Sequence, residues 1–137
     1  MAVVTIHQPE HFPYMGFFQK MEKADLFVIL DNVNYRKNYF QNRNKFLNSN
    51  GVEEWFSVPV EKGSTNKWIK EVKVNNNLPW KKKLLNKLYC NFKHDFSNIY
   101  DSDDLIEINM RSIHWAREQL NIKTPIVYAS MLVFFFF

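Results

Sequence analysis

The 137-residue sequence contains few of the residues on which several common sites depend. Its single cysteine, Cys90, excludes an internal disulfide and a cysteine-based metal cluster. Because Cys90 lies among apolar residues of a predicted helix, we expect a buried thiol and not a nucleophile. Pro9 separates His7 from His11 and prevents a helical pair of imidazoles, so we predict no metal site. The sequence has three glycines and neither a GxxxxGKS/T nor a GxGxxG pattern, which excludes the usual phosphate-binding glycine loops.

Long apolar runs are also missing. A membrane-spanning helix needs roughly 18 consecutive apolar residues, whereas the apolar stretch at the C-terminus is shorter and contains Ser130. Residues 1–5 include no basic residue, and the apolar segment that they begin ends at His7, which is not the pattern of a signal peptide. We therefore expect a cytoplasmic protein without a membrane span.

The charge balance is mildly basic, with 18 Lys and Arg against 14 Asp and Glu and a net charge of +4. Such an excess favours anionic ligands, including nucleic acid. The cations are scattered over 36–45, 81–83 and isolated positions, however, while Asp101, Asp103 and Asp104 form an acidic group. We predict that nucleic acid is not a partner. A hydrophobic content of 46% is enough for the core of one globular domain.

The first 33 residues predict two parallel strands. Residues 3–6 form one apolar run, and residues 26–30 form a second one without polar alternation. An unbroken apolar run of this length is typical of a strand that is covered on both faces, as in parallel sheets. Residues 15–23 have apolar side chains at helical spacing, so they provide the helix that connects the two strands.

Polar residues follow both predicted strands. His7 and Gln8 come after the first strand, and Asp31 and Asn32 come after the second. Ligands of parallel α/β sheets bind beyond the carboxyl ends of the strands, so these four residues should meet at one edge. A histidine there can act as a general base near neutral pH, and Asp31 can orient it or bind a hydroxyl or amine.

The segment 34–45 is polar, basic and aromatic without a regular period. Its cations can hold phosphate while its aromatic rings stack on a base or sugar, and Arg43 can bind a carboxylate or phosphate with two N–H groups. An ordinary solvated loop has the same composition, and both interpretations stay open. Gly16 also has two interpretations, because it either admits a ligand to the start of a helix or avoids a clash with a neighbouring strand.

The remaining sequence predicts an antiparallel excursion and further helices. Asn50-Gly51 is a strong hairpin signal, so residues 43–60 should form a hairpin. The later elements that we expect are a short strand at 69–74, a helix at 79–92, a helix from near 102 to 120 and a strand at 126–129. The prediction is an α/β fold, with a partly parallel sheet, flanking helices and an antiparallel hairpin excursion.

Several short motifs together resemble the WbqC-like family. The stretch IHQPEHFPYMGFFQKMEKADLFVILDNV, a later QNRN, an NG turn and a VPV strand are similar to the family's HQPxYxPWxGYF, ADxFVxLDxVQF, QNRN, NG and TVPV elements. The likeness runs from about Val4 to Met131. The sequence departs from the family pattern at His11-Phe12, Tyr14 and Asn34-Tyr35. Most of these departures exchange an aromatic residue for another aromatic one or a polar residue for another polar one. We expect them to affect substrate preference.

The resemblance implies a protein of bacterial O-antigen or other surface-polysaccharide biosynthesis. It further implies a transferase that passes glycine, or another amino acid or acyl group, to a nucleotide-linked sugar. Two alternatives stay open: a non-catalytic accessory or binding protein of the same pathway, and a nucleotidylyltransferase-like enzyme, whose opening arrangement of strand, histidine and helix is similar. The expected partner is a small molecule, either a nucleotide sugar or an activated amino acid. No cofactor and no oligomeric state is indicated.

Residue chemistry and the resemblance together define one predicted site. Its predicted catalytic residues are His7 and Asp31. Its predicted substrate-binding residues are Gln8, Tyr14, Gly16, Asn32, Lys37, Asn42, Arg43 and Asn44.

The C-terminal end departs from the resemblance. Members of the family continue into a further α/β portion, so residues 1–131 are interpreted as a single, truncated WbqC-like domain and residues 132–137 as an apolar tail outside the family pattern. The four terminal phenylalanines make a large apolar surface. We expect the chain to lack activity as it stands. The alternative is a compact variant in which these side chains plug an apolar surface.

Overall fold

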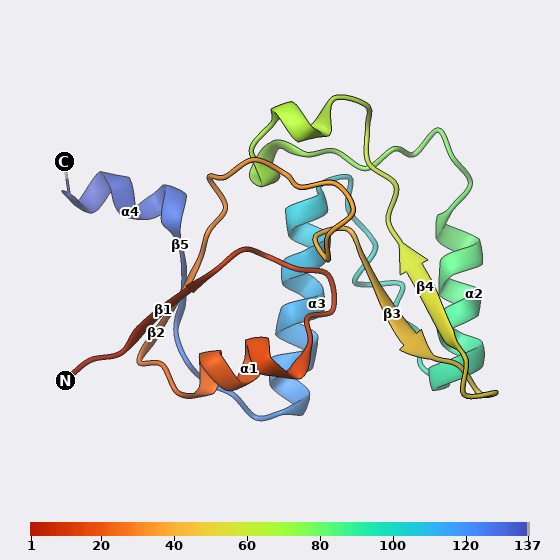
Figure 1. The fold of residues 1–137 in the computed structure, drawn as a ribbon, viewed down its shortest axis with the longest axis horizontal. Helices are drawn as coiled ribbons and strands as arrows, with labels where there is room; N and C mark the ends of the chain where they lie inside the picture. Colours follow the sequence, from red (N-terminus) through yellow and green to blue (C-terminus); the bar gives the residue numbers. More distant parts are fainter. Residues whose placement is uncertain (137) are drawn as a thin grey trace.

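The computed structural model describes the backbone of residues 1–136 and the side chains of residues 1–132. A parallel sheet lies at one end and a β-hairpin at the other, with helix α3 (Leu105–Gln119) between them (Figure 1). The elements of the sheet half are β1 (Val4–His7), α1 (Met15–Glu22), β2 (Leu26–Ile29), β5 (Ile126–Tyr128) and α4 (Ala129–Phe136). Those of the hairpin half are β3 (Arg43–Leu47), β4 (Glu53–Ser57), two 3₁₀ turns (Ser64–Asn66 and Ile69–Glu71) and α2 (Lys81–Phe92).

Strands β1, β2 and β5 form a parallel sheet in which β2 is central. His7 lies opposite Ile29, and Ile29 lies opposite Tyr128, so the three strands end at the same level. The apolar run of β2 is buried as its pattern predicts, and Phe27 and Ile29 are fully inaccessible to solvent. The predicted parallel pairing of the first two strands, with a helix between them, is therefore confirmed.

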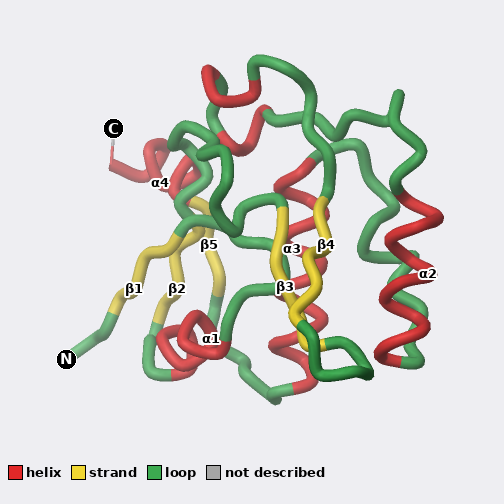
Figure 2. Tube along the Cα trace, turned by 45° about the vertical axis from the view of Figure 1, so that its right-hand side comes forward, coloured by secondary structure: helices red, strands yellow, loops and turns green. Residues whose placement is uncertain are grey.

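Helix α3 provides a wall that two apolar clusters share. Towards the sheet, its Met110 and Ile113 pack in one cluster with Phe17 of α1 and Phe27 of β2. Towards the hairpin, its Ile108 belongs to a larger cluster that includes side chains of β4, α2 and the second 3₁₀ turn. Figure 2 shows the strands of the sheet and those of the hairpin as two separate groups. The helix therefore joins the two halves of the molecule through its opposite faces.

The hairpin predicted around Gly51 is confirmed. Strands β3 and β4 pair antiparallel, with Arg43 opposite Ser57 and Leu47 opposite Glu53. Gly51 turns the chain at a φ of 74°, in the left-handed region that glycine adopts without steric cost.

The strand predicted at residues 69–74 is wrong. This segment contains the 3₁₀ turn Ile69–Glu71, followed by single bridges from Lys73 to Asp104 and from Val74 to Val60. Its apolar residues are nevertheless buried in the larger cluster. The apolar pattern therefore reflected the burial of a loop, which places side chains inward without a continuous ladder.

Cys90 is exposed, so the expectation of a buried thiol is wrong. The inward face of α2 is formed by Leu84 and Leu88. Cys90 comes two residues after Leu88, which is a rotation of about 200° around the helix axis, and it therefore faces solvent.

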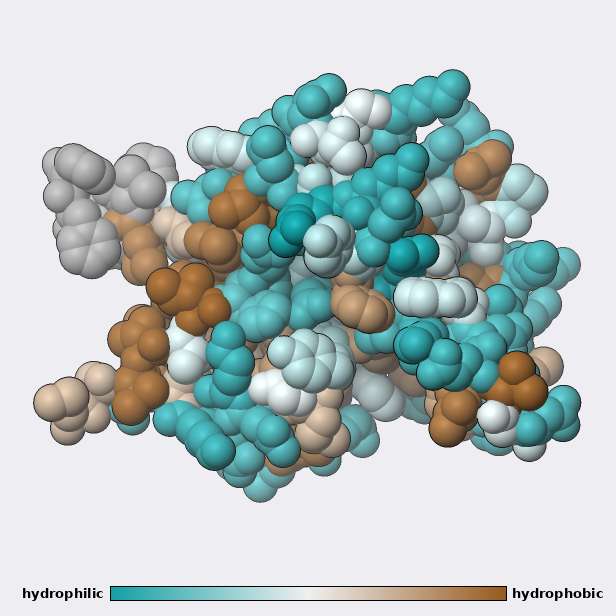
Figure 3. Space-filling view, viewed as in Figure 1, coloured by the Kyte–Doolittle hydropathy of each residue, from teal (hydrophilic) through white to brown (hydrophobic). Residues whose placement is uncertain are grey.

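The edge strand β1 carries exposed apolar side chains. Val4 and Ile6 are each 54% exposed, and Figure 3 shows apolar residues in brown gathered beside the N-terminal end of the chain. β1 has one partner strand, β2, among the residues that the structure describes.

The C-terminal segment forms helix α4 directly after β5. Within residues 1–136, no helix combines the length and the apolar character that crossing a membrane requires. The alternative in which the terminal phenylalanines plug an apolar surface concerns side chains outside those described.

Phe27 provides a test of the central position of β2. Its buried ring packs edge-to-face against Phe17, with 5.1 Å between the ring centroids. We predict that Phe27→Ala lowers the free energy of unfolding by about 3–5 kcal/mol, because it removes buried apolar area and leaves a cavity. Urea denaturation followed by circular dichroism measures this loss. Tyr89→Ala is the control, since Tyr89 is 55% exposed and its replacement should cost less than about 1 kcal/mol. Equal losses in both variants would contradict the arrangement.

Candidate functional site

The carboxyl ends of the three parallel strands meet at one edge of the sheet. His7 ends β1, Asp31 follows β2 and Ser130 follows β5. Asp31 is buried, and its two carboxylate oxygens accept hydrogen bonds from the backbone N–H and the hydroxyl of Ser130. Asp31 thus anchors the first turn of α4. The catalytic role predicted for Asp31 stays a prediction.

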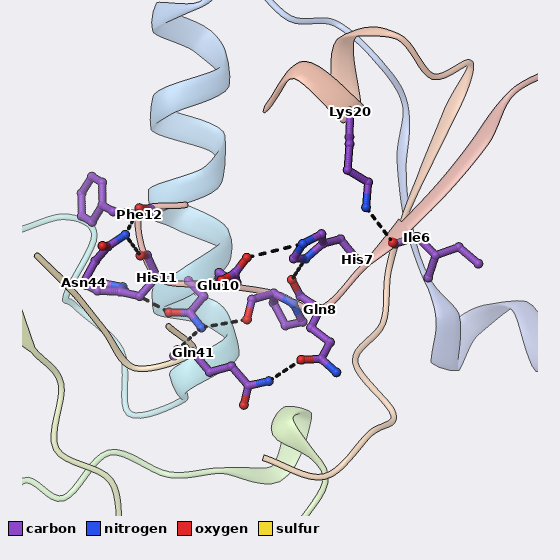
Figure 4. Close-up of polar contacts among 11 residues, drawn as sticks. Ile6, His7, Gln8, Glu10, His11, Phe12, Lys20, Gln41 and Asn44 are labelled. Atoms are coloured by element: carbon purple, nitrogen blue, oxygen red, sulfur yellow. Dashed lines mark hydrogen bonds and ion pairs between the residues drawn. The ribbon is translucent and has the colours of Figure 1, made fainter. Parts of the chain in front are cut away.

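The partner of His7 in this structure is Glu10. His7 Nε2 lies 3.5 Å from Oε1 of Glu10 (Figure 4). The other ring nitrogen, Nδ1, lies 2.9 Å from the backbone carbonyl of Gln8. A carbonyl oxygen only accepts hydrogen bonds, so Nδ1 carries the proton and the Nε2 of the neutral ring presents an electron pair beside Glu10. This is the arrangement of a general base with a carboxylic partner.

Burial sets the protonation of the His7–Glu10 pair. Desolvation raises the pKa of Glu10 to about 7, and the charge of Lys20 opposes this rise. Desolvation also lowers the pKa of His7, against the hydrogen bond to Gln8, which raises it. The pair therefore holds one exchangeable proton on Glu10 below about pH 7 and releases it above that pH.

The loop that carries Glu10 is fixed to α3 by a buried chain of hydrogen bonds. His11 is fully buried, and its Nδ1 lies 3.1 Å from Oδ1 of Asn109 while its Nε2 lies 2.8 Å from the hydroxyl of Tyr100. Asn109 Nδ2 donates to the backbone carbonyl of Gln41 at 2.6 Å, which leaves Asn109 Oδ1 as the acceptor for His11. Nδ1 of His11 therefore carries the proton, and Nε2 accepts from Tyr100.

Phe12 bends this loop through a strained backbone. Its φ is 43°, in the left-handed region that costs a bulky residue roughly 1–3 kcal/mol. The N–H of Phe12 donates to Oγ of Ser112 on α3, and its carbonyl accepts from Nδ2 of Asn44 on β3. Its ring packs against Trp115, with 6.0 Å between the ring centroids. Contacts on both sides hold the strained residue and fix the path of the loop towards α1.

The QNRN element reaches the same loop from the hairpin half. Gln41 is buried, its Nε2 donates to Oε1 of Gln8 at 2.7 Å, and its Oε1 accepts from the backbone N–H of Arg36. Asn42 donates to the carbonyl of Val58 and so closes the top of the hairpin. The HQP and QNRN motifs, which are more than thirty residues apart in the sequence, are in direct contact.

Several cavities lie around this network, and two of them contain more than one predicted substrate-binding residue together with charged side chains. The Glu10 cavity has a volume of about 400 Å³ and is lined by Glu10, Tyr14, Phe40, Asn44, Lys45, Phe46, Leu47 and Glu53. The Arg43 cavity has a volume of about 450 Å³, and its relevant residues are Lys37, Asn42, Arg43, Glu61, Lys62 and Ser64.

Arg43 is held at the wall of the Arg43 cavity. Its Nη2 donates to the carbonyl of Asn38 at 2.9 Å, and its guanidinium lies 4.4 Å from the ring centroid of Trp55. Its Nε is buried and has no hydrogen-bond partner among the residues that the structure describes. Because this atom is inaccessible to solvent, the guanidinium contributes its positive charge to the cavity wall, and Nε is not a donor that a ligand reaches directly.

Gly16 provides room for the ring of Tyr14. A Cβ at position 16 would lie 2.5 Å from Cε2 of Tyr14. Tyr14 is 58% exposed and lines the Glu10 cavity. The glycine therefore avoids a clash with this ring, and not with a strand. The role of Gly16 in admitting a ligand stays a prediction.

The predicted site residues fall into separate groups. Asn32 is half-buried in the bend after β2. The strand-end group is His7, Gln8 and Asp31; Tyr14 and Asn44 line the Glu10 cavity; Lys37, Asn42 and Arg43 line the Arg43 cavity. Sequence reasoning missed Glu10 and Asn109. For Glu10, the signal in the sequence was its position three residues after His7. For Asn109, the signal was a polar amide between two apolar residues of a predicted helix.

The fold and this edge define a class of α/β protein, in which a parallel sheet and a hairpin are joined through a central helix and a polar loop. The chain belongs to the WbqC-like protein family, whose sequence model matches residues 8–134. It is 34% identical over 76 residues to the uncharacterized protein Rv1507c of Mycobacterium tuberculosis H37Rv. The match covers 55% of this chain and 32% of that protein, so the chain spans about a third of this relative. No solved structure matches the chain.

The buried, neutral His11 makes stability depend on pH. Desolvation lowers the pKa of His11 from 6.5 to about 4, against the hydrogen bond with Asn109, which raises it. As the pH falls below 6.5, the unfolded chain binds a proton that the folded protein does not. The stabilising contribution of neutral His11 is therefore complete above pH 6.5 and is lost as the pH falls towards 4.

We predict that His11→Gln is less stable than the wild type at pH 7, and that this gap narrows by about 2–3 kcal/mol at pH 4.5, because only the wild type loses the His11 contribution. Urea denaturation of both proteins at the two pH values measures the gap. Glu10 is present in both proteins, so its opposite pH dependence cancels in the difference. A gap that stays constant would contradict the burial of a neutral imidazole.

Proposed function

We propose that this chain acts in bacterial surface-polysaccharide biosynthesis as a transferase, which passes glycine or another acyl group to an amine or hydroxyl of a sugar. The observation that carries the proposal is the His7–Glu10 pair at the carboxyl ends of a parallel sheet. This is the edge at which such sheets bind their ligands. The chain spans about a third of the relative that it matches, so activity of this chain by itself is part of the proposal. It stands against the expectation from the sequence that the chain lacks activity as it stands, and the assay below decides between the two.

In the proposed reaction, the His7–Glu10 pair moves one proton. The amine or hydroxyl of the sugar attacks the acyl carbon of an activated amino acid, and the pair takes the proton that this nucleophile loses. The pair then gives a proton to the leaving group as the bond between the acyl carbon and the donor breaks. Each turnover thus returns His7 and Glu10 to their starting state.

We assign the phosphates of a nucleotide sugar to the Arg43 cavity. Its charged residues are Lys37, Arg43 and Lys62 against Glu61, a formal charge of +2. Charge-assisted hydrogen bonds from such groups bind phosphate strongly.

The proton-transfer role predicts a pH profile. The chain is incubated with a UDP- or dTDP-sugar and a preactivated glycine, either glycyl adenylate or a glycyl thioester, and the aminoacyl sugar is measured by mass spectrometry. We expect the rate to rise through about pH 7 as Glu10 ionises. His7→Gln and Glu10→Gln should each lower the rate by about 10²–10⁴-fold, and Glu10→Gln should also remove the step near pH 7. His94→Gln, at an exposed position outside both cavities, is the control.

The outcomes separate the competing functions. Unchanged turnover in His7→Gln contradicts the proposed base. Binding of a nucleotide sugar without turnover supports an accessory protein. Release of pyrophosphate from a nucleoside triphosphate and a sugar 1-phosphate, in the absence of glycine and dependent on His7, supports a nucleotidylyltransferase-like enzyme.

The Arg43 cavity predicts a separate effect on affinity. We expect Arg43→Gln to weaken binding of the nucleotide sugar by about tenfold or more, because a hydrogen bond to a charged group contributes about 1.5–3 kcal/mol. Calorimetric titration with a UDP-sugar measures the change. Lys123→Gln removes one positive charge from an exposed position away from the cavity and is the matched control. Equal weakening in both variants indicates that only net charge matters.

A further inference from the structure

We propose that the Glu10 cavity binds an amino sugar, with the sugar nitrogen at the carboxyl group of Glu10. This inference rests on the proposed function, because it names the acceptor of that reaction. A volume of about 400 Å³ lies in the range of small-molecule sites. The charges and the aromatic walls of the cavity favour an amine.

The charges of the two cavities are opposite. The charged residues of the Glu10 cavity are Glu10 and Glu53 against Lys45, a formal charge of −1 when Glu10 is ionised. The Arg43 cavity has a formal charge of +2. A phosphate is therefore favoured in the Arg43 cavity, and a cationic group is favoured in the Glu10 cavity.

Most polar groups in the Glu10 cavity already have partners. Lys45 Nζ pairs with Glu53 at 3.0 Å. The amide of Asn44 donates to the carbonyls of His11 and Phe12, and its oxygen accepts from the backbone N–H of Lys45. Glu53 is paired with a lysine, whereas the partner of Glu10 among the described residues is the neutral His7. A cationic ligand nitrogen therefore gains more binding energy at Glu10 than at Glu53.

Two aromatic side chains form walls that suit a sugar ring. Tyr14 is 58% exposed and Phe40 is 40% exposed, although both line the cavity. Phe40 stacks on Trp55 with an interplanar angle of 20°, and the absence of a side chain at Gly16 lets the Tyr14 ring lie at the start of α1. Aromatic faces pack against the C–H groups of a pyranose, and their electrons attract a nearby cation.

The chemistry of the amine follows from its place beside the His7–Glu10 pair. An ammonium group binds the carboxylate form of Glu10 and gives one proton to it, and this proton passes to solvent before the acyl transfer, so that the pair is again free to take the proton that the amine loses on attack. This leaves a neutral amine with the electron pair that it needs to attack an acyl carbon. A hydroxyl at the same place lacks the charge that draws it to Glu10, and a carboxylate is repelled.

Binding of free sugars tests this inference without any acyl donor. The full chain is titrated at pH 7 with glucosamine, N-acetylglucosamine and glucose, and binding is followed by NMR shifts. We expect glucosamine to bind at least tenfold more tightly than the other two sugars, and Glu10→Gln to remove this preference. Tyr14→Ala and Phe40→Ala should each weaken glucosamine binding by about fivefold. Gly16→Ala should weaken it as well, because its Cβ displaces the Tyr14 ring.

Tyr39→Ala is the matched control. Tyr39 is 49% exposed and packs on Arg36, outside the Glu10 cavity, so its loss should leave glucosamine binding unchanged. Circular dichroism of each variant establishes that it is folded. Equal binding of the three sugars, no binding of glucosamine, or a preference that survives in Glu10→Gln would each overturn the inference.

Failure of this inference is distinguishable from failure of the proposed function. A glucosamine preference without acyl transfer leaves the amine site standing and removes the transferase. Acyl transfer that is unchanged in Tyr14→Ala and Phe40→Ala leaves the transferase standing and removes the amine site in the Glu10 cavity.

Discussion

The candidate site depends on one buried amide, that of Asn109 on helix α3. Its oxygen accepts a hydrogen bond from Nδ1 of His11, which lies in the loop after β1. Its nitrogen donates a hydrogen bond to the backbone carbonyl of Gln41 in the hairpin half. An amide is suited to this place because it offers donor and acceptor side by side, and each buried group left without a partner would cost about 1–3 kcal/mol. Asn109 therefore connects the loop that holds Glu10 to both α3 and the hairpin half, and the hydrogen bonds of Ser112 and Asn44 add to this connection.

Residues that identify the family mostly support this loop. The side chains of Gln8 and Gln41 bond to each other, and the amide of Asn44 bonds to loop carbonyls. The groups left for a ligand are a different set, chiefly the His7–Glu10 pair and the cationic side chains of the Arg43 cavity. One is acidic and the other cationic, so a substrate with an amine at one end and phosphates at the other has a preferred direction of binding.

The sequence predicts the frame better than the site. The apolar run of β2 and the Asn50-Gly51 turn are local signals, and both elements form where expected. Glu10 was missed because its approach to His7 depends on a loop whose path passes through the left-handed backbone of Phe12, and nothing local to the sequence predicts that conformation for phenylalanine. Asn109 was missed because its partners lie 98 and 68 residues away.

The distance along the chain between His11 and Asn109 also orders the events of folding. β1, α1 and β2 are close in sequence and can associate early, whereas the loop between β1 and α1 acquires its fixed path only when α3 is in place, about a hundred residues later. During synthesis, the first thirty residues leave the ribosome well before the helix that shapes their loop. We therefore expect the pairing of His7 with Glu10 to form late in folding, once both halves of the molecule have come together.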